Sequence, residues 1–230
     1  MKIYGLQKVS LLDFPCHVAC TVFLGGCDFR CPYCHNMELA AMIAPPAMDD
    51  EEFFAFLKKR QGILDGVAIS GGEPCIHADL PDFINKIREL GFKVKLDTNG
   101  AHPKMLRKLL DSHMVDYVAM DIKNDLGNYH TTCGVEKVDL TAIQESIQLL
   151  MNSDIEYEFR TTVVMEFFDD SSFEGISQLI AGAREYYLQS FTDRETVPCH
   201  NLHAPSKDDM LRYADICQKT IPNVSLRGID

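Results

Sequence analysis

Two kinds of hydrophobic pattern alternate along the chain, one typical of strands and one typical of helices. Short runs rich in β-branched and aromatic residues predict six strands, over 18–24, 66–70, 92–97, 115–122, 157–164 and 185–191. Longer runs with apolar residues at helical spacing predict helices between them, over 50–61, 80–90, 103–111, 140–151 and 172–183. This alternation is typical of a parallel α/β sheet whose strands are joined by helices.

The segment after the sixth strand repeats the pattern once more. A loop is expected over 192–205, a helix over 207–219 and a seventh strand over 224–226. The resulting right-handed βα series fits either an incomplete barrel or an open doubly wound sheet. At 230 residues the chain is expected to form a single domain, with a core over about 17–191 and a C-terminal extension over 192–230.

Composition and charge narrow the classes of function. Apolar residues make up 46% of the chain and charged residues 24%, as in ordinary globular proteins. The net charge of −12 would repel a phosphate backbone, so no nucleic acid partner is expected. There is no apolar run of about 18 residues and no secretory signal pattern at the start. We therefore expect a cytoplasmic protein with no membrane partner, in which metal or redox chemistry accounts for the presence of nine cysteines better than a disulfide framework does.

Polar side chains follow three of the predicted strands at the point where each strand ends. These segments are 71–74 (Gly-Gly-Glu-Pro), 97–100 (Asp-Thr-Asn-Gly) and 121–123 (Asp-Ile-Lys). The carboxyl ends of parallel strands meet at one edge of the sheet, and ligands bind there in both candidate folds. The three segments are therefore expected to share one rim.

Three cysteines lie close together after the first predicted strand. Cys27, Cys31 and Cys34 are spaced by four and three residues, in a loop whose glycines and proline favour a tight turn. Thiolates are the soft ligands that iron–sulfur clusters and zinc select, and three ligands on a four-iron cluster leave one iron open to a substrate. The alternatives are a zinc knuckle completed by His35, which directly follows Cys34 and is awkwardly placed for one tetrahedral ion, or three unconnected core thiols.

The two motifs together, Cys-x3-Cys-x2-Cys after the first strand and Gly-Gly-Glu-Pro after the second, resemble those of the radical S-adenosylmethionine (SAM) superfamily. A closer resemblance, over most of the chain, is to the activating enzymes of glycyl radical proteins, particularly those of anaerobic ribonucleoside-triphosphate reductase. It implies an incomplete (β/α)6 barrel of the TIM-like type. The matching stretches are 5–8, 13–15, the cysteine loop, 69–74, 95–100, 117–123, 158–164 and 187–191.

The resemblance also implies which residues bind the cofactors. A single [4Fe–4S] cluster would be held by Cys27, Cys31 and Cys34. SAM would be contacted by Tyr33, Gly71, Gly72, Glu73, Asp97, Thr98, Asp121, Lys123 and Arg160. Glu73 would accept from the SAM ammonium, and Lys123 and Arg160 would reach its carboxylate. Asp97 and Asp121 would repel each other without a cationic ligand or a monovalent cation between them, although a cap or turn role for Asp97 is an alternative.

The implied chemistry is carried by the cofactors, so no residue is expected to be catalytic, including His77, His102, His113 and His130. The reduced cluster would cleave SAM to methionine and a 5′-deoxyadenosyl radical, which takes hydrogen from a glycine Cα of a glycyl radical enzyme. A flavodoxin- or ferredoxin-type protein would donate the electron. Two alternatives stay open. One is radical chemistry on a small molecule, as in deazaguanine-type relatives, or on a modified peptide; the other is a non-catalytic metal-binding or electron-transfer module.

Overall fold

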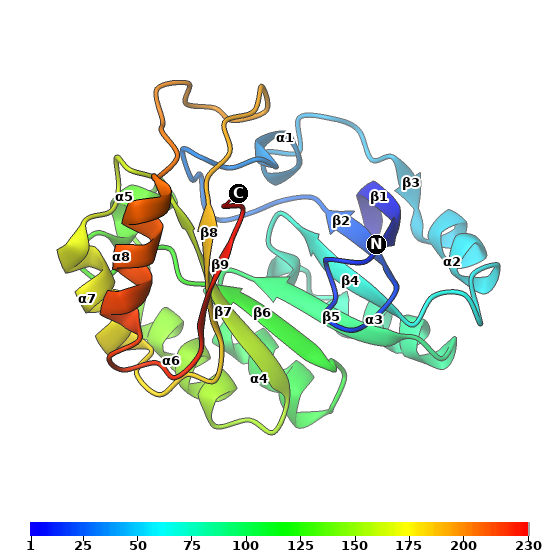
Figure 1. The fold of residues 1–230 in the computed structure, drawn as a ribbon. Helices are drawn as coiled ribbons and strands as arrows, with labels where there is room; N and C mark the ends of the chain where they lie inside the picture. The colour runs from blue at the N-terminus through cyan, green and yellow to red at the C-terminus, as the bar shows by residue number, and fades with distance from the viewer. Residues whose placement is uncertain (230) are drawn as a thin grey trace.

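The computed structural model describes residues 1–229, which form one nine-stranded sheet with helices on its outer side (Figure 1). The strands are β1 (Lys2–Ser10), β2 (Ala19–Leu24), β3 (Met48–Asp49), β4 (Gly66–Gly71), β5 (Lys93–Thr98), β6 (Tyr117–Asp121), β7 (Glu156–Val163), β8 (Tyr186–Ser190) and β9 (Val224–Arg227). The helices are α1 (Met37–Ala40), α2 (Asp50–Lys58), the 3-10 turn η1 (Pro74–Ile76), α3 (Leu80–Glu89), α4 (Pro103–Asp111), α5 (Tyr129–Cys133), α6 (Leu140–Met151), α7 (Asp170–Leu179) and α8 (Lys207–Cys217). No helix in this described part is long and apolar enough to cross a membrane. Asp230, the last residue of the predicted extension, lies outside the described residues.

The sheet is an incomplete barrel of parallel strands with an antiparallel addition at one edge. Its order is β3-β1-β2-β4-β5-β6-β7-β8-β9, and β1 pairs antiparallel with both β2 and β3. From β4 to β9 each strand lies beside the next one along the chain. The order of these parallel strands in the sheet therefore follows the chain and never reverses, as it would in a doubly wound sheet. This observation selects the incomplete barrel of the two candidate folds.

The strands and helices expected from the sequence are confirmed. The six predicted strands are β2 and β4 to β8, and the seventh is β9. Sequence patterns do not reveal β1, because only Ile3 and Ser10 are buried in it and no regular alternation results. They also miss α5, which has five residues and is too short to show helical periodicity.

The concave side of the sheet carries charged residues. On β5 and β7 the residues that alternate onto this side are Lys95, Asp97, Glu158 and Arg160, while their neighbours, such as Leu96, pack beneath the helices. Charges inside a barrel must be paired to offset the cost of desolvation. The interior of this barrel is therefore built from ion pairs rather than from apolar packing alone.

Glu158 is the most deeply buried of these charges, and edge strand β9 neutralises it. Its carboxylate, 0% exposed, accepts hydrogen bonds from the Arg227 guanidinium at 3.0 and 2.9 Å and from the Tyr117 hydroxyl at 2.9 Å. Burial by itself raises the pKa of Glu158, but the Arg227 hydrogen bonds, together with the positive charges of Arg160, Lys95 and Arg227, outweigh it and hold the pKa below the ordinary value of 4.5. The pair thus stabilises the folded state above pH 4.5, and this contribution is lost as the pH falls further through the lower folded-state pKa.

We expect Glu158→Gln to lower the free energy of unfolding by about 2 kcal/mol at pH 7, because it leaves the partly exposed Arg227 without its counter-charge. Urea unfolding at several pH values measures the free energy of unfolding of both proteins. The difference between the variant and the unmodified protein should become smaller below pH 4.5. The control is Glu145→Gln, in the exposed pair with Arg107, which should cost less than about 1 kcal/mol. Equal losses in the two variants would contradict the prediction.

Candidate functional site

The cysteine loop and three strand ends surround one cavity of about 250 Å³ at the carboxyl edge of the sheet. Its lining includes every residue of the predicted cofactor site: Cys27, Cys31, Tyr33, Cys34, Gly71, Gly72, Glu73, Asp97, Thr98, Asp121, Lys123 and Arg160. The prediction that the three polar segments share one rim is confirmed. The part that each residue plays toward a cofactor stays a prediction.

The cysteine loop is held on both sides by backbone contacts. The Gly26 N–H donates to the Leu39 carbonyl at 3.0 Å, and the Arg30 N–H donates to the Cys133 carbonyl at 2.9 Å. Gly134 packs so closely that a Cβ there would lie 2.0 Å from the Arg30 carbonyl oxygen. Helices α1 and α5, neither of which the sequence pattern revealed, therefore fix the position of the loop.

The three thiols of the loop differ in how readily they ionise. Burial raises the pKa of Cys27 to about 12, and it also raises the pKa of Cys34. A hydrogen bond with the Cys133 thiol lowers the pKa of Cys31 to about 7, and the positive charge of Lys123 acts in the same direction. Because the thiolate is the form that binds metals, Cys31 is the thiol best prepared to do so. Cys133 is isolated in the sequence, and nothing there shows that it lies beside Cys31.

His35 does not take the position that the zinc alternative requires. Its Nε2 lies 2.7 Å from the Thr192 carbonyl oxygen, and its ring stacks on Phe191 with 5.8 Å between centroids. Over residues 1–229, no three His, Cys, Asp or Glu side chains are arranged around one point as a metal site requires, and this holds for the three thiols of the loop as well as for His35. His35 instead joins the cysteine loop to the end of β8.

Gly71, the last residue of β4, and Gly72, which follows it, allow two backbones to approach closely. A Cβ on Gly72 would lie 1.9 Å from the Gly26 carbonyl oxygen, and a Cβ on Gly71, with φ of +113°, would lie 2.3 Å from that of Leu24. The Glu73 N–H also donates to the Gly26 carbonyl at 2.8 Å. Packing of 71–74 on the cysteine loop is thus an observed reason for the glycines, separate from the predicted contact with SAM.

The Glu73 carboxylate is buried and joins two of the strand ends. It accepts hydrogen bonds from the Thr98 hydroxyl at 2.7 Å, from the Asn99 N–H at 2.6 Å and from the Cys75 N–H at 2.9 Å. Burial raises the pKa of Glu73, and these three donors act against that rise. They account for a buried glutamate without any ligand, so its predicted contact with the SAM ammonium stays a prediction.

A polar network beside Cys27 was not visible from the sequence. Asn99 Nδ2 donates to Asp28 Oδ1 at 2.9 Å and lies 4.0 Å from Cys27 Sγ. His102 Nε2 lies 3.0 Å from the other oxygen of Asp28. Only one hint of this network was present in the sequence, which is that Asn99 belongs to a polar segment at the end of a strand. The contacts of Asp28 with Asn99 and His102 could not be predicted, because they depend on how distant segments meet at the rim.

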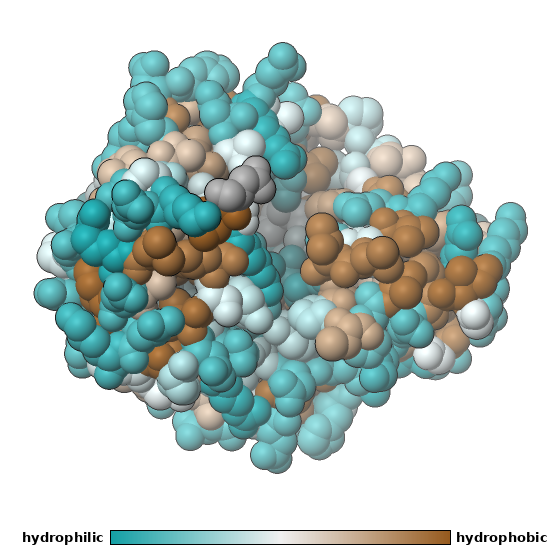
Figure 2. Space-filling view, in the orientation of Figure 1, coloured by the Kyte–Doolittle hydropathy of each residue, from teal (hydrophilic) through white to brown (hydrophobic). Residues whose placement is uncertain are grey.

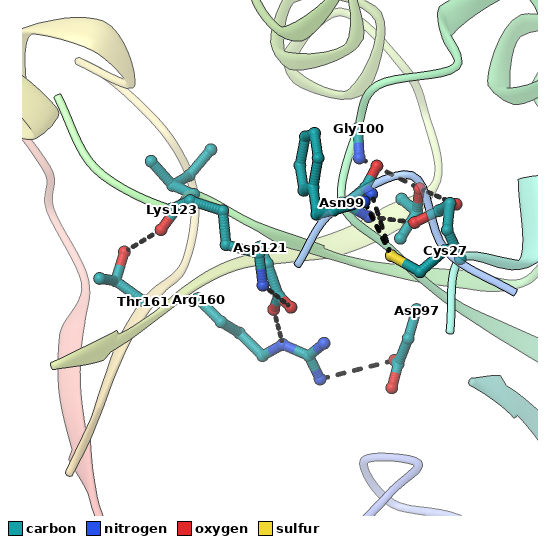
Figure 3. A network of polar contacts seen from close by, with 12 residues as sticks. Cys27, Asp97, Asn99, Gly100, Asp121, Lys123, Arg160 and Thr161 are labelled. Carbon is teal, nitrogen blue, oxygen red and sulfur yellow. Dashed lines mark hydrogen bonds and ion pairs between the residues drawn. The ribbon is translucent and has the colours of Figure 1, made fainter. Parts of the chain in front are cut away.

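Arg160 lies between Asp97 and Asp121, the two aspartates that we expected to repel each other without a cation between them (Figure 3). Its Nε donates to Asp121 Oδ1 at 2.9 Å, and its Nη1 lies 3.5 Å from Asp97 Oδ1. Lys123 adds a hydrogen bond of 3.0 Å to Asp121 Oδ2. Burial alone raises the pKa of Asp121, but Arg160 and Lys123 lower it to about 2. The cation between the carboxylates is therefore a guanidinium of the protein itself, and a bound monovalent cation stays a prediction.

The donor groups present fit a cluster and an amino-acid ligand. Three soft thiols line one cavity, and Asp97 Oδ1 is buried there without a hydrogen-bond partner among the described residues. Tyr33 and Phe29, each 5% exposed, complete an apolar wall on the cysteine side. This oxygen is in ion pairs with Arg160 and Lys95, each 3.5 Å away, but its capacity to accept a hydrogen bond is unused, and an ammonium-bearing ligand could use it.

Comparison with known proteins gives matches in both sequence and structure. The model of the Radical SAM superfamily matches residues 21–180. The chain is 28% identical over 239 residues to MJ1227 of Methanocaldococcus jannaschii, a protein named for activation of a glycyl-radical enzyme, with 99% of this chain and 96% of that protein covered. It is 30% identical over 128 residues to the pyruvate formate-lyase-activating enzyme of Clostridium pasteurianum, with 54% of this chain and 52% of that enzyme covered.

Among solved structures, SuiB of Streptococcus suis bound to S-adenosylmethionine superposes with a TM-score of 0.68 at 13% identity. The match covers 90% of this chain and 52% of SuiB. At that identity the likeness concerns the fold alone. It agrees with the incomplete barrel described above.

We expect anaerobic reconstitution with iron and sulfide to give about four irons per chain. Each of the single replacements of Cys27, Cys31 and Cys34 by Ala should abolish a stable cluster, because only two of the three thiolates that bind its irons would remain. Iron analysis and the visible absorption of the cluster measure this. Cys16→Ala, at an exposed thiol on the first loop, is the matched control and should retain full iron content. One zinc per chain, with no sulfide taken up, would contradict the prediction.

Proposed function

The chain belongs to the radical SAM superfamily, and from this membership we propose that it is an activating enzyme for a glycyl radical protein, with anaerobic ribonucleoside-triphosphate reductase as its protein substrate. One observation supports the proposal most directly: three thiols and three polar strand ends line a single cavity. The likeness to MJ1227 over nearly the whole of both chains favours activation of a protein over chemistry on a small molecule.

Cys27, Cys31 and Cys34 would hold the [4Fe–4S] cluster, and a set of three thiolates would leave one of its four irons open to SAM. The chemistry supplied would be one electron for the cleavage of SAM to methionine and a 5′-deoxyadenosyl group, which would take a glycine Cα hydrogen atom and leave 5′-deoxyadenosine and a glycyl radical. A flavodoxin- or ferredoxin-type protein would supply that electron.

The remaining residues of the cavity would bind and orient SAM. Lys123 and Arg160 would hold its carboxylate, although both are already paired with Asp121, so the ligand would share their charge. Asp97 Oδ1, which makes no hydrogen bond within the described residues, would face the sulfonium, the ammonium or a monovalent cation. Buried charges that are paired before the ligand arrives are preorganised, and little reorganisation is needed on binding.

The wall formed by Tyr33 and Phe29 would exclude water from the cluster and from the reacting groups. Exclusion of water protects a reactive intermediate from side reactions and tunes the potential of a cluster. No histidine or carboxylate is needed as a general base, because a hydrogen atom rather than a proton is removed.

We expect the reduced, reconstituted protein, given SAM and anaerobic ribonucleoside-triphosphate reductase, to produce one glycyl radical signal by electron paramagnetic resonance. The signal should be accompanied by 5′-deoxyadenosine and methionine in equal amounts. Cys31→Ala, treated in the same way, should give none. A reductase variant in which the target glycine is replaced by Ala is the control for the partner.

The two parts of the proposal fail in different ways. Cleavage of SAM without a radical on the reductase, but with a radical on another glycyl radical protein, would refute the choice of partner alone. Failure to cleave SAM at all in a chain with about four irons would refute radical activation itself.

A further inference from the structure

Most polar side chains around the cavity have partners within the protein. Asp121 binds Arg160 and Lys123, Glu73 binds three donors, and Ser70 Oγ donates to Asp97 Oδ2 at 2.9 Å. The contacts within the protein therefore account for the position of each of these groups. Polar side chains of the cavity that have no hydrogen-bond partner in the protein are the candidates for contact with a further ligand.

Two neighbouring side chains on β7 and β8 have no such partner. Thr162 and Gln189 line the same cavity as the three thiols, and neither side chain makes a hydrogen bond with any residue of the described chain 1–229. They are register partners in the parallel ladder between β7 and β8, so their side chains stand next to each other on the same face. Together they present one hydroxyl and one amide to the cavity.

We propose that Gln189 and Thr162 bind the main chain of the substrate polypeptide next to its target glycine; this rests on the proposed function. Glycine has no side chain by which a site could recognise it, so its position must be fixed through peptide N–H and C=O groups. A primary amide suits this purpose because its NH₂ donates and its oxygen accepts, which allows it to pair with both groups of one peptide unit.

The position of the pair agrees with this role. Thr162 lies two residues after Arg160 on β7, further toward the carboxyl edge and hence nearer the mouth of the barrel. Arg160 and its register partner Asp121, two of the charges predicted to bind SAM, lie deeper in the barrel. A polypeptide that entered from the mouth would therefore meet Gln189 and Thr162 before it reached these two charges.

The experiment compares Gln189→Ala and Thr162→Val with the unmodified protein in the glycyl radical assay, first with the reductase concentration varied at saturating SAM and then with the SAM concentration varied at saturating reductase. Loss of one neutral hydrogen bond should raise the KM for the reductase about three- to tenfold. The rate at saturating reductase should change less than the KM does. Gln144→Ala, at an exposed glutamine on α6, is the matched control and should leave the KM unchanged.

The outcomes separate the inference from the function on which it rests. An unchanged KM for the reductase in both variants, with the unmodified protein active, would overturn the inference alone. A rise in the KM for SAM equal to that for the reductase would also overturn it, because the pair would then belong to the cofactor site. No glycyl radical from the unmodified protein on any candidate partner would refute the proposed function and the inference together.

Discussion

The placement of Arg160 between Asp97 and Asp121 is the interaction on which the rest of the site depends. Three parallel strands bring these charges to one edge, and without the guanidinium the two carboxylates would repel each other in a poorly solvated interior. The charge of Asp97 Oδ1 is balanced by Arg160 and Lys95, each 3.5 Å away, but the oxygen makes no hydrogen bond within the described residues. The charges of the cavity are therefore compensated by the protein, and this oxygen can still accept a hydrogen bond from a ligand.

A second constraint is the close packing of the cysteine loop on its neighbours. Gly72 approaches Gly26 and Gly134 approaches Arg30 at distances that no side chain would permit. The loop is consequently fixed by backbone contacts, and its three thiols do not depend on the metal for their general location. These contacts place the loop at the cavity, whereas the side chains of its three thiols are not arranged around a single point.

The parallel strands, and the grouping of the three thiols and the polar segments at one edge of the sheet, were predictable from the sequence. Such a prediction requires only local patterns and the rule that the carboxyl ends of parallel strands meet at one edge. The pattern could not show β1, whose exposed residues break the alternation, or the contact of Cys133 with Cys31. It also could not show that Glu73, which the resemblance assigns to SAM, accepts hydrogen bonds from three donors of its own chain. Tertiary contacts of this kind depend on how distant segments meet, which composition and periodicity do not record.

The central claim is that one corner of the cluster is left free by the protein and is occupied by SAM. Electron–nuclear double resonance of the reduced protein, with SAM carrying ¹⁵N in its amine, tests this most directly. The account predicts a nitrogen coupling strong enough to require a direct bond to one iron. Absence of that coupling, together with a fourth ligand from a side chain of this protein, would contradict it.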